Sequence, residues 1–192
     1  MSNAPNAYAA PLAPRFRVEA AADGGQRIVV PARRSLFLMA FLTVWLAGWS
    51  FGGAAAMARM WADFSPFLAF WLCGWALGEA GVIATLAWMA AGRETIRAAG
   101  ADLEISAELL GFVRRRLYRG AHIHNLSAAG SPELFARRRL DNPMLWAPAS
   151  GGVKFVYGAR TVYAGVGLDE AEGAMIVDLL KRRLPKGAAA GG

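Results

Sequence analysis

The sequence predicts a membrane α-helical hairpin joined to a small α+β domain, which we expect to be an antiparallel β-barrel or sandwich capped by one C-terminal helix. Two apolar runs, Leu36–Ala58 and Pro66–Ala91, are each longer than the roughly 20 residues that cross the hydrocarbon core of a bilayer. Short segments rich in β-branched residues lie on both sides of these runs. A stretch with helical spacing of its apolar residues closes the chain.

Charge and composition support a membrane location. The chain has 192 residues, of which 56% are hydrophobic, and a net charge of +7, whereas soluble domains are roughly 45–50% apolar. Because basic flanks stay in the cytoplasm, we expect a multi-pass protein of the bacterial inner membrane with both termini cytoplasmic. The flanking basic residues are Arg33, Arg34, Arg93 and Arg97, against Arg59 alone between the runs.

The chain before the hairpin divides into two parts. Residues 1–14 are rich in Ala, Pro and Asn without apolar periodicity, which is typical of a disordered tail. Residues 15–34 contain two alternating segments, Arg15–Glu19 and Gln26–Val30, separated by a turn ending in Asp23-Gly24-Gly25. Two strands alone are marginal in water, so we expect them to join the sheet of the soluble domain.

The chain after the hairpin, 92–185, carries the rest of that domain. A long irregular loop is expected over Ala129–Gly152, and a flexible tail over 186–192. Asp169 is a good N-cap for the final helix, which we expect to stop at Pro185. The predicted strands are Arg93–Ala98, Leu103–Ala107, Leu110–Tyr118, Ala121–Ser127, Val153–Tyr157 and Thr161–Val166.

The hairpin spans residues 35–91. Glu79 is the one residue of a type that is charged at neutral pH inside the two apolar runs. An ionised carboxylate near the bilayer midplane is costly, so we expect it to be uncharged and hydrogen-bonded. Ser50 lies at a similar depth, and the indole N–H of Trp75 is a further candidate donor. Three roles remain open: a hydrogen bond that locks the hairpin, a contact with a partner's transmembrane helix, and a step in a proton relay.

Glycine and tryptophan are frequent in the hairpin. Gly74 and Gly78 are four residues apart in the second run, as are Gly48 and Gly52 in the first. Small residues at this spacing allow helix backbones to approach closely, although glycine is also simply common in membrane helices. Six of the seven Trp residues lie in the hairpin region: Trp45, Trp49, Trp61, Trp71, Trp75 and Trp88.

Arginines gather in the expected cytoplasmic part. Alternation along a strand places Arg114 and Arg116 on one face. A basic surface near the membrane attracts anionic headgroups, but the same residues could be a solvated face that enforces topology. The candidate lipid- or partner-binding residues are Arg114, Arg116, Arg119, Arg137, Arg138 and Arg139.

No catalytic or cofactor motif is present in the sequence. His122 and His124 could start a metal site, but a third ligand is not evident nearby, so a polar outer strand face opposite Ile123 is the favoured explanation. Cys73 is the lone cysteine, so it forms no disulfide within the chain and packs as a small apolar residue. We expect no enzyme, no metal, no cofactor and no nucleic-acid partner.

The order of elements resembles bacterial membrane proteins of uncharacterised function that carry a pleckstrin-homology-type (PH-like) domain beside a transmembrane hairpin. The segments that carry the resemblance are Ile28–Arg34, Phe70-Trp71 to Gly78-Glu79, Gly92-Arg93-Glu94, Leu103 to Tyr118 and Gly167–Leu184. The resemblance implies a membrane-anchored binding or scaffolding role and carries over no catalytic residue. The phosphoinositide ligand of many eukaryotic PH domains is not transferred.

These observations favour a non-enzymatic scaffold. We expect an accessory or assembly subunit whose hairpin anchors the PH-like domain at the inner membrane and docks another membrane protein or complex, or acidic lipids. The alternative is a small transport or proton-handling component that uses Glu79.

Overall fold

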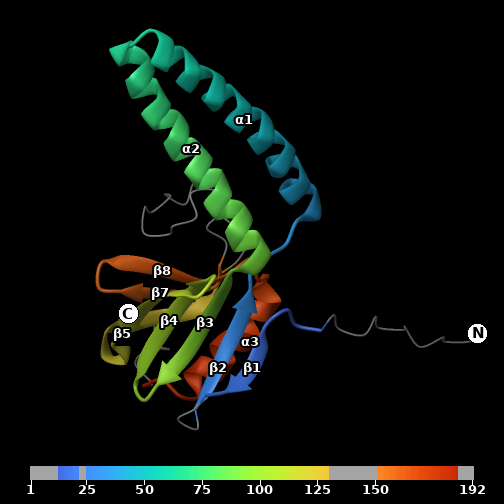
Figure 1. Cartoon of the computed structure of the whole chain (residues 1–192). Coiled ribbons are helices and arrows are strands. Elements are labelled where there is room, and N and C mark those ends of the chain that lie inside the picture. Colours follow the sequence, from blue (N-terminus) through green and yellow to red (C-terminus); the bar gives the residue numbers. More distant parts are fainter. Residues whose placement is uncertain (1–12, 22–24, 130–150, 186–192) are drawn as a thin grey trace, which may run out of the picture.

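A computed structural model describes residues 13–21, 25–129 and 151–185. Two long helices project together from a domain of strands and one short helix (Figure 1). The long helices are α1 (Leu36–Ala62) and α2 (Pro66–Ala91), and the short one is α3 (Glu170–Lys181). Between the long helices, Ser65 is the N-cap of α2 and Pro66 occupies its first turn, a position where proline's missing N–H costs nothing.

The first sheet has five antiparallel strands in chain order. Neighbours in sequence are neighbours in space throughout, so β3 is the central strand. The strands are β1 (Arg17–Ala20), β2 (Gln26–Pro31), β3 (Arg93–Ala99), β4 (Asp102–Leu109) and β5 (Phe112–Tyr118).

The second sheet has three antiparallel strands in the order β6-β7-β8. A short 3₁₀ turn at Gly120–His122 (η1) leads into it. The strands are β6 (Ile123–Ala128), β7 (Gly151–Tyr157) and β8 (Arg160–Val166). α3 packs against β6 and β7.

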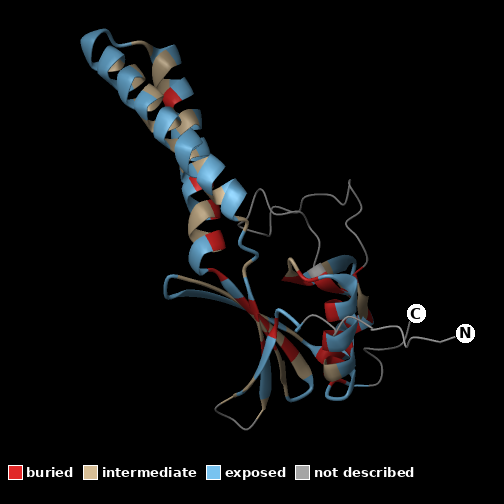
Figure 2. Ribbon diagram, turned by 90° about the vertical axis from the view of Figure 1, so that its right-hand side faces the viewer, coloured by how far each residue is buried: buried red, intermediate tan, exposed pale blue. Residues whose placement is uncertain are grey.

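The core lies between the two sheets and α3. Its fully buried side chains come from all three layers, and they include Ile96 and Leu103 of the first sheet, Phe155 of the second and Ile176 of α3. In Figure 2 most buried residues lie along the strands and the inner side of α3, whereas the long helices are mostly exposed, with buried residues only in α2. The sheet domain therefore has a core of its own.

A capping box starts α3. The Asp169 carboxylate accepts from the Glu172 N–H at 2.8 Å, and the Glu172 carboxylate accepts from the Asp169 N–H at 3.1 Å. Arg15 also donates to Glu172, from its backbone N–H at 2.7 Å and its guanidinium at 2.8 Å. Burial alone would raise the pKa of Glu172, but these hydrogen bonds outweigh it and lower the pKa. The N-terminal strands are thereby fastened to the C-terminal helix.

The long helices are inserted between two paired strands. β2 ends at Pro31, a short segment before α1, and β3 begins at Arg93, after the Gly92 C-cap of α2. Pro31 and Arg93 are register partners. The pairing continues into the junction, because Ala32 N–H donates to the Gly92 carbonyl at 3.0 Å. Both ends of the hairpin therefore join the same sheet on the same side.

α1 and α2 have the length and composition of membrane spans. At about 1.5 Å rise per residue, 27 and 26 residues extend about 40 Å. Their outward side chains include Phe37, Phe41, Val44, Phe70 and Leu77, all exposed. A helix that is apolar all round belongs in a protein core or a bilayer, and these two are not covered by the rest of the described chain.

The α+β class and the hairpin are thus confirmed at this level, with three corrections. Within the described residues the strands form two sheets and no closed barrel. α1 continues to Ala62 instead of ending at Ala58, because Arg59 is favourable in a last helical turn. The β4–β5 turn is Leu110-Gly111 and not Glu108-Leu109.

Several expectations lie outside the described residues. These are most of the N-terminal tail, the loop over 130–150 with its arginine triplet, and the tail over 186–192.

Glu94 ties the two sheets together. It lies on β3, is buried, and its Oε2 accepts from the N–H groups of Gly165 at 3.0 Å and Val166 at 3.1 Å on β8. Burial raises the pKa of this carboxyl, although the two hydrogen bonds act in the opposite direction. A group whose pKa is raised on folding stabilises the fold most below its ordinary pKa, and the contribution is lost as the pH rises through the raised value.

We predict that Glu94→Ala will destabilise the sheet domain by about 1–3 kcal/mol, since two buried N–H groups lose their acceptor. Glu94→Gln keeps an acceptor and removes the buried charge, so at neutral pH it should be as stable as the wild type or more so. Amide hydrogen exchange at Gly165 and Val166, compared at pH 5 and pH 8 in detergent, measures both effects. Equal protection in the Ala variant and the wild type would show that Glu94 does not join the sheets.

Candidate functional site: the seam between the long helices and the basic edge strand

The two long helices meet along a regular seam. The less exposed residues of each helix recur at alternating spacings of three and four, which is the repeat of a coiled-coil interface. In α1 this series is Met39, Leu42, Leu46, Trp49, Gly53, Ala56 and Met60, and in α2 it is Leu68, Leu72, Trp75, Glu79, Val82, Leu86 and Met89. Further less exposed residues beside the series are Ser50 and Gly52 of α1 and Ala69, Gly81, Thr85, Ala87 and Trp88 of α2. Each helix thus turns one stripe to its partner and the rest of its surface outward.

Four tryptophans form a continuous stack across this seam. Trp49 of α1 and Trp75 of α2 lie at its centre, with ring centroids 3.8 Å apart and planes 18° from parallel. Trp45 stacks on Trp49 at 4.5 Å, and Trp71 leans on Trp75 at 4.4 Å. The stack therefore packs Trp49 and Trp75 between the helices, with Trp45 and Trp71 at its two ends.

Two polar contacts lie beside the stack. Ser50 Oγ donates to Glu79 Oε1, and Trp49 Nε1 donates to the Trp75 carbonyl at 3.4 Å. The Trp75 indole N–H is buried and, in the part of the chain described here, has no acceptor. Trp75 therefore does not donate to Glu79. The carboxyl finds its partner within the hairpin, which matches the locking role among the three left open.

The glycines divide into two groups. A Cβ on Gly52 or Gly53 would meet the Trp75 ring, at 3.2 Å and 2.9 Å, and one on Gly78 would meet Trp49 at 3.6 Å. These glycines make room for indole rings. At Gly48, Gly74 and Gly81 a Cβ would meet nothing within 4 Å, so these glycines lie open on the helix surface and do not bring the two backbones together.

The structure thus brings together four of the five residues that the sequence suggested as intramembrane contacts. Ser50, Glu79, Trp75 and Gly78 lie at one level of the seam, and Gly74 lies outside it. Gly53 was not singled out from the sequence, although its close contact with Trp75 is tighter than that of Gly52. A seven-residue repeat that included Trp49 and Gly53 would have found it.

The basic candidates are more dispersed. Arg114 and Arg116 share a face of β5, as alternation predicts, and they pair with Ala107 and Ile105 on the core-facing side of the sheet. Arg119 follows Tyr118 at the other end of the strand, about 17 Å from Arg114 at roughly 3.3 Å per residue. Arg137, Arg138 and Arg139 lie outside the described residues. The described arginines therefore form no single patch.

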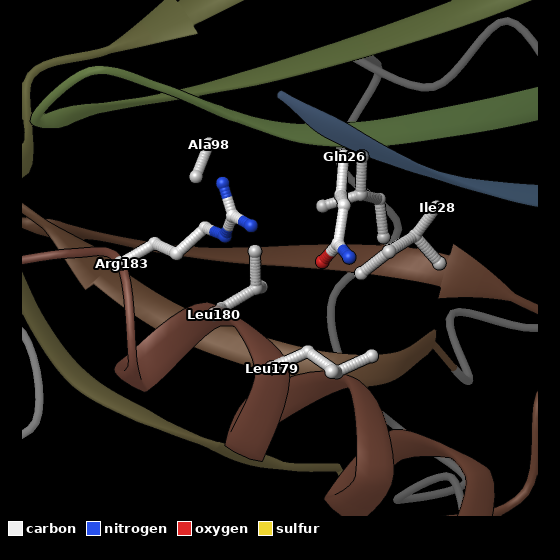
Figure 3. A pocket seen from close by; sticks show the side chains of 7 residues that line it. Gln26, Ile28, Ala98, Leu179, Leu180 and Arg183 are labelled. Atoms are coloured by element: carbon white, nitrogen blue, oxygen red, sulfur yellow. The ribbon is translucent and has the colours of Figure 1, made fainter. Parts of the chain in front are cut away.

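Other possible sites in the described chain are small. A shallow groove between α3 and the strands β2 and β3 holds a cavity of only about 10 Å³ (Figure 3). Its polar lining groups are Gln26 and Arg183, and enclosed ligand pockets are typically roughly 300–1,000 Å³. Among the described residues no three His, Cys, Asp or Glu side chains lie together as metal ligands. His122 is in the 3₁₀ turn and not in a strand with His124.

Comparisons with models of protein families, with curated proteins and with solved structures found no match. The seam and the sheet edge are therefore interpreted from their own geometry.

We predict that Gly53→Leu will disrupt the tryptophan stack, because a side chain there collides with the Trp75 ring. Gly48→Leu is the matched control on the same helix, since its Cβ has open space. Coupled indoles produce a near-ultraviolet circular dichroism signal, which should be lost in the Gly53 variant and kept in the Gly48 variant. Identical spectra of the two variants would contradict the packing described.

We also predict that Glu79→Leu will weaken the hairpin by about 0.6 kcal/mol and at most about 1.7 kcal/mol, the range for hydrogen bonds between membrane helices. Glu79→Gln keeps a partner for Ser50 and should be close to the wild type. Unfolding in a sodium dodecyl sulfate titration, followed by tryptophan fluorescence, gives the difference. A Leu variant that inserts, unfolds and binds partners like the wild type would exclude both the lock and the contact.

Proposed function

We propose that the chain is a non-enzymatic docking protein of the bacterial inner membrane, with both termini cytoplasmic, and an accessory or assembly subunit of a membrane-protein complex. In this proposal the hairpin anchors the sheet domain and one side of the hairpin receives a transmembrane helix of the partner. The domain is PH-like in the order of its strands and its C-terminal helix, and this assignment is part of the proposal.

The observation that carries the proposal is the open glycine strip beside the tryptophan stack. Gly74 and Gly81 share a helix face with Gly78, and Gly48 shares one with Gly52, while Gly52 and Gly78 border the same pair of stacked rings. The outer rings of the stack, Trp45 and Trp71, remain 37% and 41% exposed.

Small residues are what membrane helices use for close approach, because lipid provides no hydrophobic drive for their association. A third helix laid along this strip could pack its backbone against the glycines and its side chains against the indole edges. The remaining surface of the hairpin carries large apolar side chains suited to lipid.

The contacts of Glu79 favour a docking role for the chain over a proton-handling role. A relay needs a series of ionisable groups. Glu79 faces the Ser50 hydroxyl, and over 36–62 and 66–91 the only other ionisable side chains are Arg59 and Cys73. The polar pair is therefore better suited to holding α1 and α2 together.

We predict that a photo-crosslinking residue at Gly74 will capture a membrane protein in intact cells, whereas the same residue at Ala80 will not. Ala80 is an exposed small residue of α2 outside the glycine strip, so it is the matched control. Gly48→Leu, which fills the strip from the other helix, should abolish the adduct formed from position 74.

The mass of the adduct identifies its partner. A different membrane protein would support the accessory-subunit role, and a second copy of this chain would contradict it. Equal yields from positions 74 and 80, or adducts with lipid alone, would remove the glycine strip as a docking surface.

A further inference from the structure

The turn between β4 and β5 lies at the end of the sheet from which the long helices leave. Arg93, the first residue of β3, pairs with Glu108, and Gly92 directly before it is the C-cap of α2. The turn residues that follow Glu108 therefore extend past the start of β3, toward the last turn of α2. Contacts between α2 and β4 agree with this placement.

This turn exposes large apolar side chains. Leu110 is 70% exposed and Phe112 is 83% exposed, and Val113 behind them is also exposed. The turn at the opposite end of the same strands, between β3 and β4, contains Gly100 and Ala101. Large exposed apolar side chains are therefore present in the β4–β5 turn, beside the hairpin, and absent from the β3–β4 turn at the opposite end.

The backbone conformation at position 110 does not explain why a leucine occupies it. Leu110 has φ +49° and Gly111 has φ +89° in a two-residue turn between Leu109 and Phe112. Such turns favour Asn-Gly or Gly-Gly, because both positions are left-handed. A large side chain in this conformation is uncommon, and an exposed one gains nothing from packing within the chain.

Arginines lie behind the apolar tip. This order matches a membrane surface, in which charged headgroups cover an apolar interior. Arg114 follows the tip by two residues and is exposed, and Arg115 is exposed on the other face, 3.8 Å from Glu104. Arg33 and Arg34 lie at the start of the first span. Interfacial membrane anchors have this arrangement, with apolar groups at the acyl boundary and arginines at the lipid headgroups.

We propose that the β4–β5 tip, Leu109–Phe112, inserts into the headgroup–acyl boundary of the bilayer that the hairpin spans, with Arg114 at anionic headgroups. The inference rests on the proposed membrane location of the hairpin. It adds a lipid contact made by the sheet domain itself, which would fix the orientation of that domain against the membrane surface.

The test uses the full chain in vesicles of phosphatidylcholine with and without phosphatidylglycerol. An environment-sensitive dye is attached at Leu110→Cys, or at Ala101→Cys as the matched control in the far turn, each in a Cys73→Ala background. A third sample carries the dye on the native Cys73, which is exposed on α2. Spin-labelled lipids and aqueous iodide serve as quenchers.

The dye at position 110 should shift to the blue and be quenched by lipids labelled near the headgroup, and the dye at position 101 should be quenched by iodide. Arg114→Gln should lower the inserted population at position 110 about fivefold in anionic vesicles, as expected for one arginine near the surface. In neutral vesicles it should have no effect.

The other outcomes separate the two proposals. Lipid quenching at Cys73 combined with iodide quenching at position 110 would overturn the inserted tip and leave the membrane location intact. Iodide quenching at Cys73 would overturn both. Protection of position 110 from both quenchers would mean that protein covers the tip, which also contradicts lipid insertion.

Discussion

The pairing of β2 with β3 is the interaction on which the rest of the structure depends. It brings together the two ends of the segment that contains both long helices, at Pro31 and Arg93. A hydrogen bond between Ala32 and Gly92 extends the pairing into the junction. Because β3 is the central strand of the five-stranded sheet, the helices are attached to the middle of the sheet.

The same junction holds the buried carboxylate that joins the two sheets. Glu94 is the second residue of β3, and it reaches Gly165 and Val166 of β8. Burying a carboxylate is unfavourable unless hydrogen bonds compensate it, and here both acceptor bonds go to backbone of the opposite sheet. The contact between the two sheets, made by Glu94, therefore lies within two residues of Gly92, where α2 joins β3.

In a bilayer, the environment proposed for the hairpin, shape and a few polar contacts would replace the hydrophobic effect. Lipid chains solvate leucine as well as another helix does, so association depends on close packing and hydrogen bonds. The Trp49–Trp75 stack needs the space left by Gly52, Gly53 and Gly78, and Ser50 satisfies Glu79 beside it. The glycines that this packing leaves open, Gly48, Gly74 and Gly81, are the ones on which the proposed partner contact rests.

Much of the local structure could be predicted from the sequence. The second span was placed at its observed bounds, Pro66–Ala91, because its apolar run ends where charged residues begin. Strand segments were found by alternation, and Asp169 was recognised as the cap of α3. The first span was placed four residues short, because a charged residue such as Arg59 can end the apolar pattern without ending the helix.

The sequence by itself determined the two long apolar helices, their flanking charges and most of the strands, because these follow from neighbouring residues. Only the tertiary structure decided that the strands form two sheets and that Gly53 and not Gly74 borders the tryptophan stack. It also placed Leu110 and Phe112 beside the hairpin. These features depend on register and on contacts between residues distant in the chain, which no local pattern records.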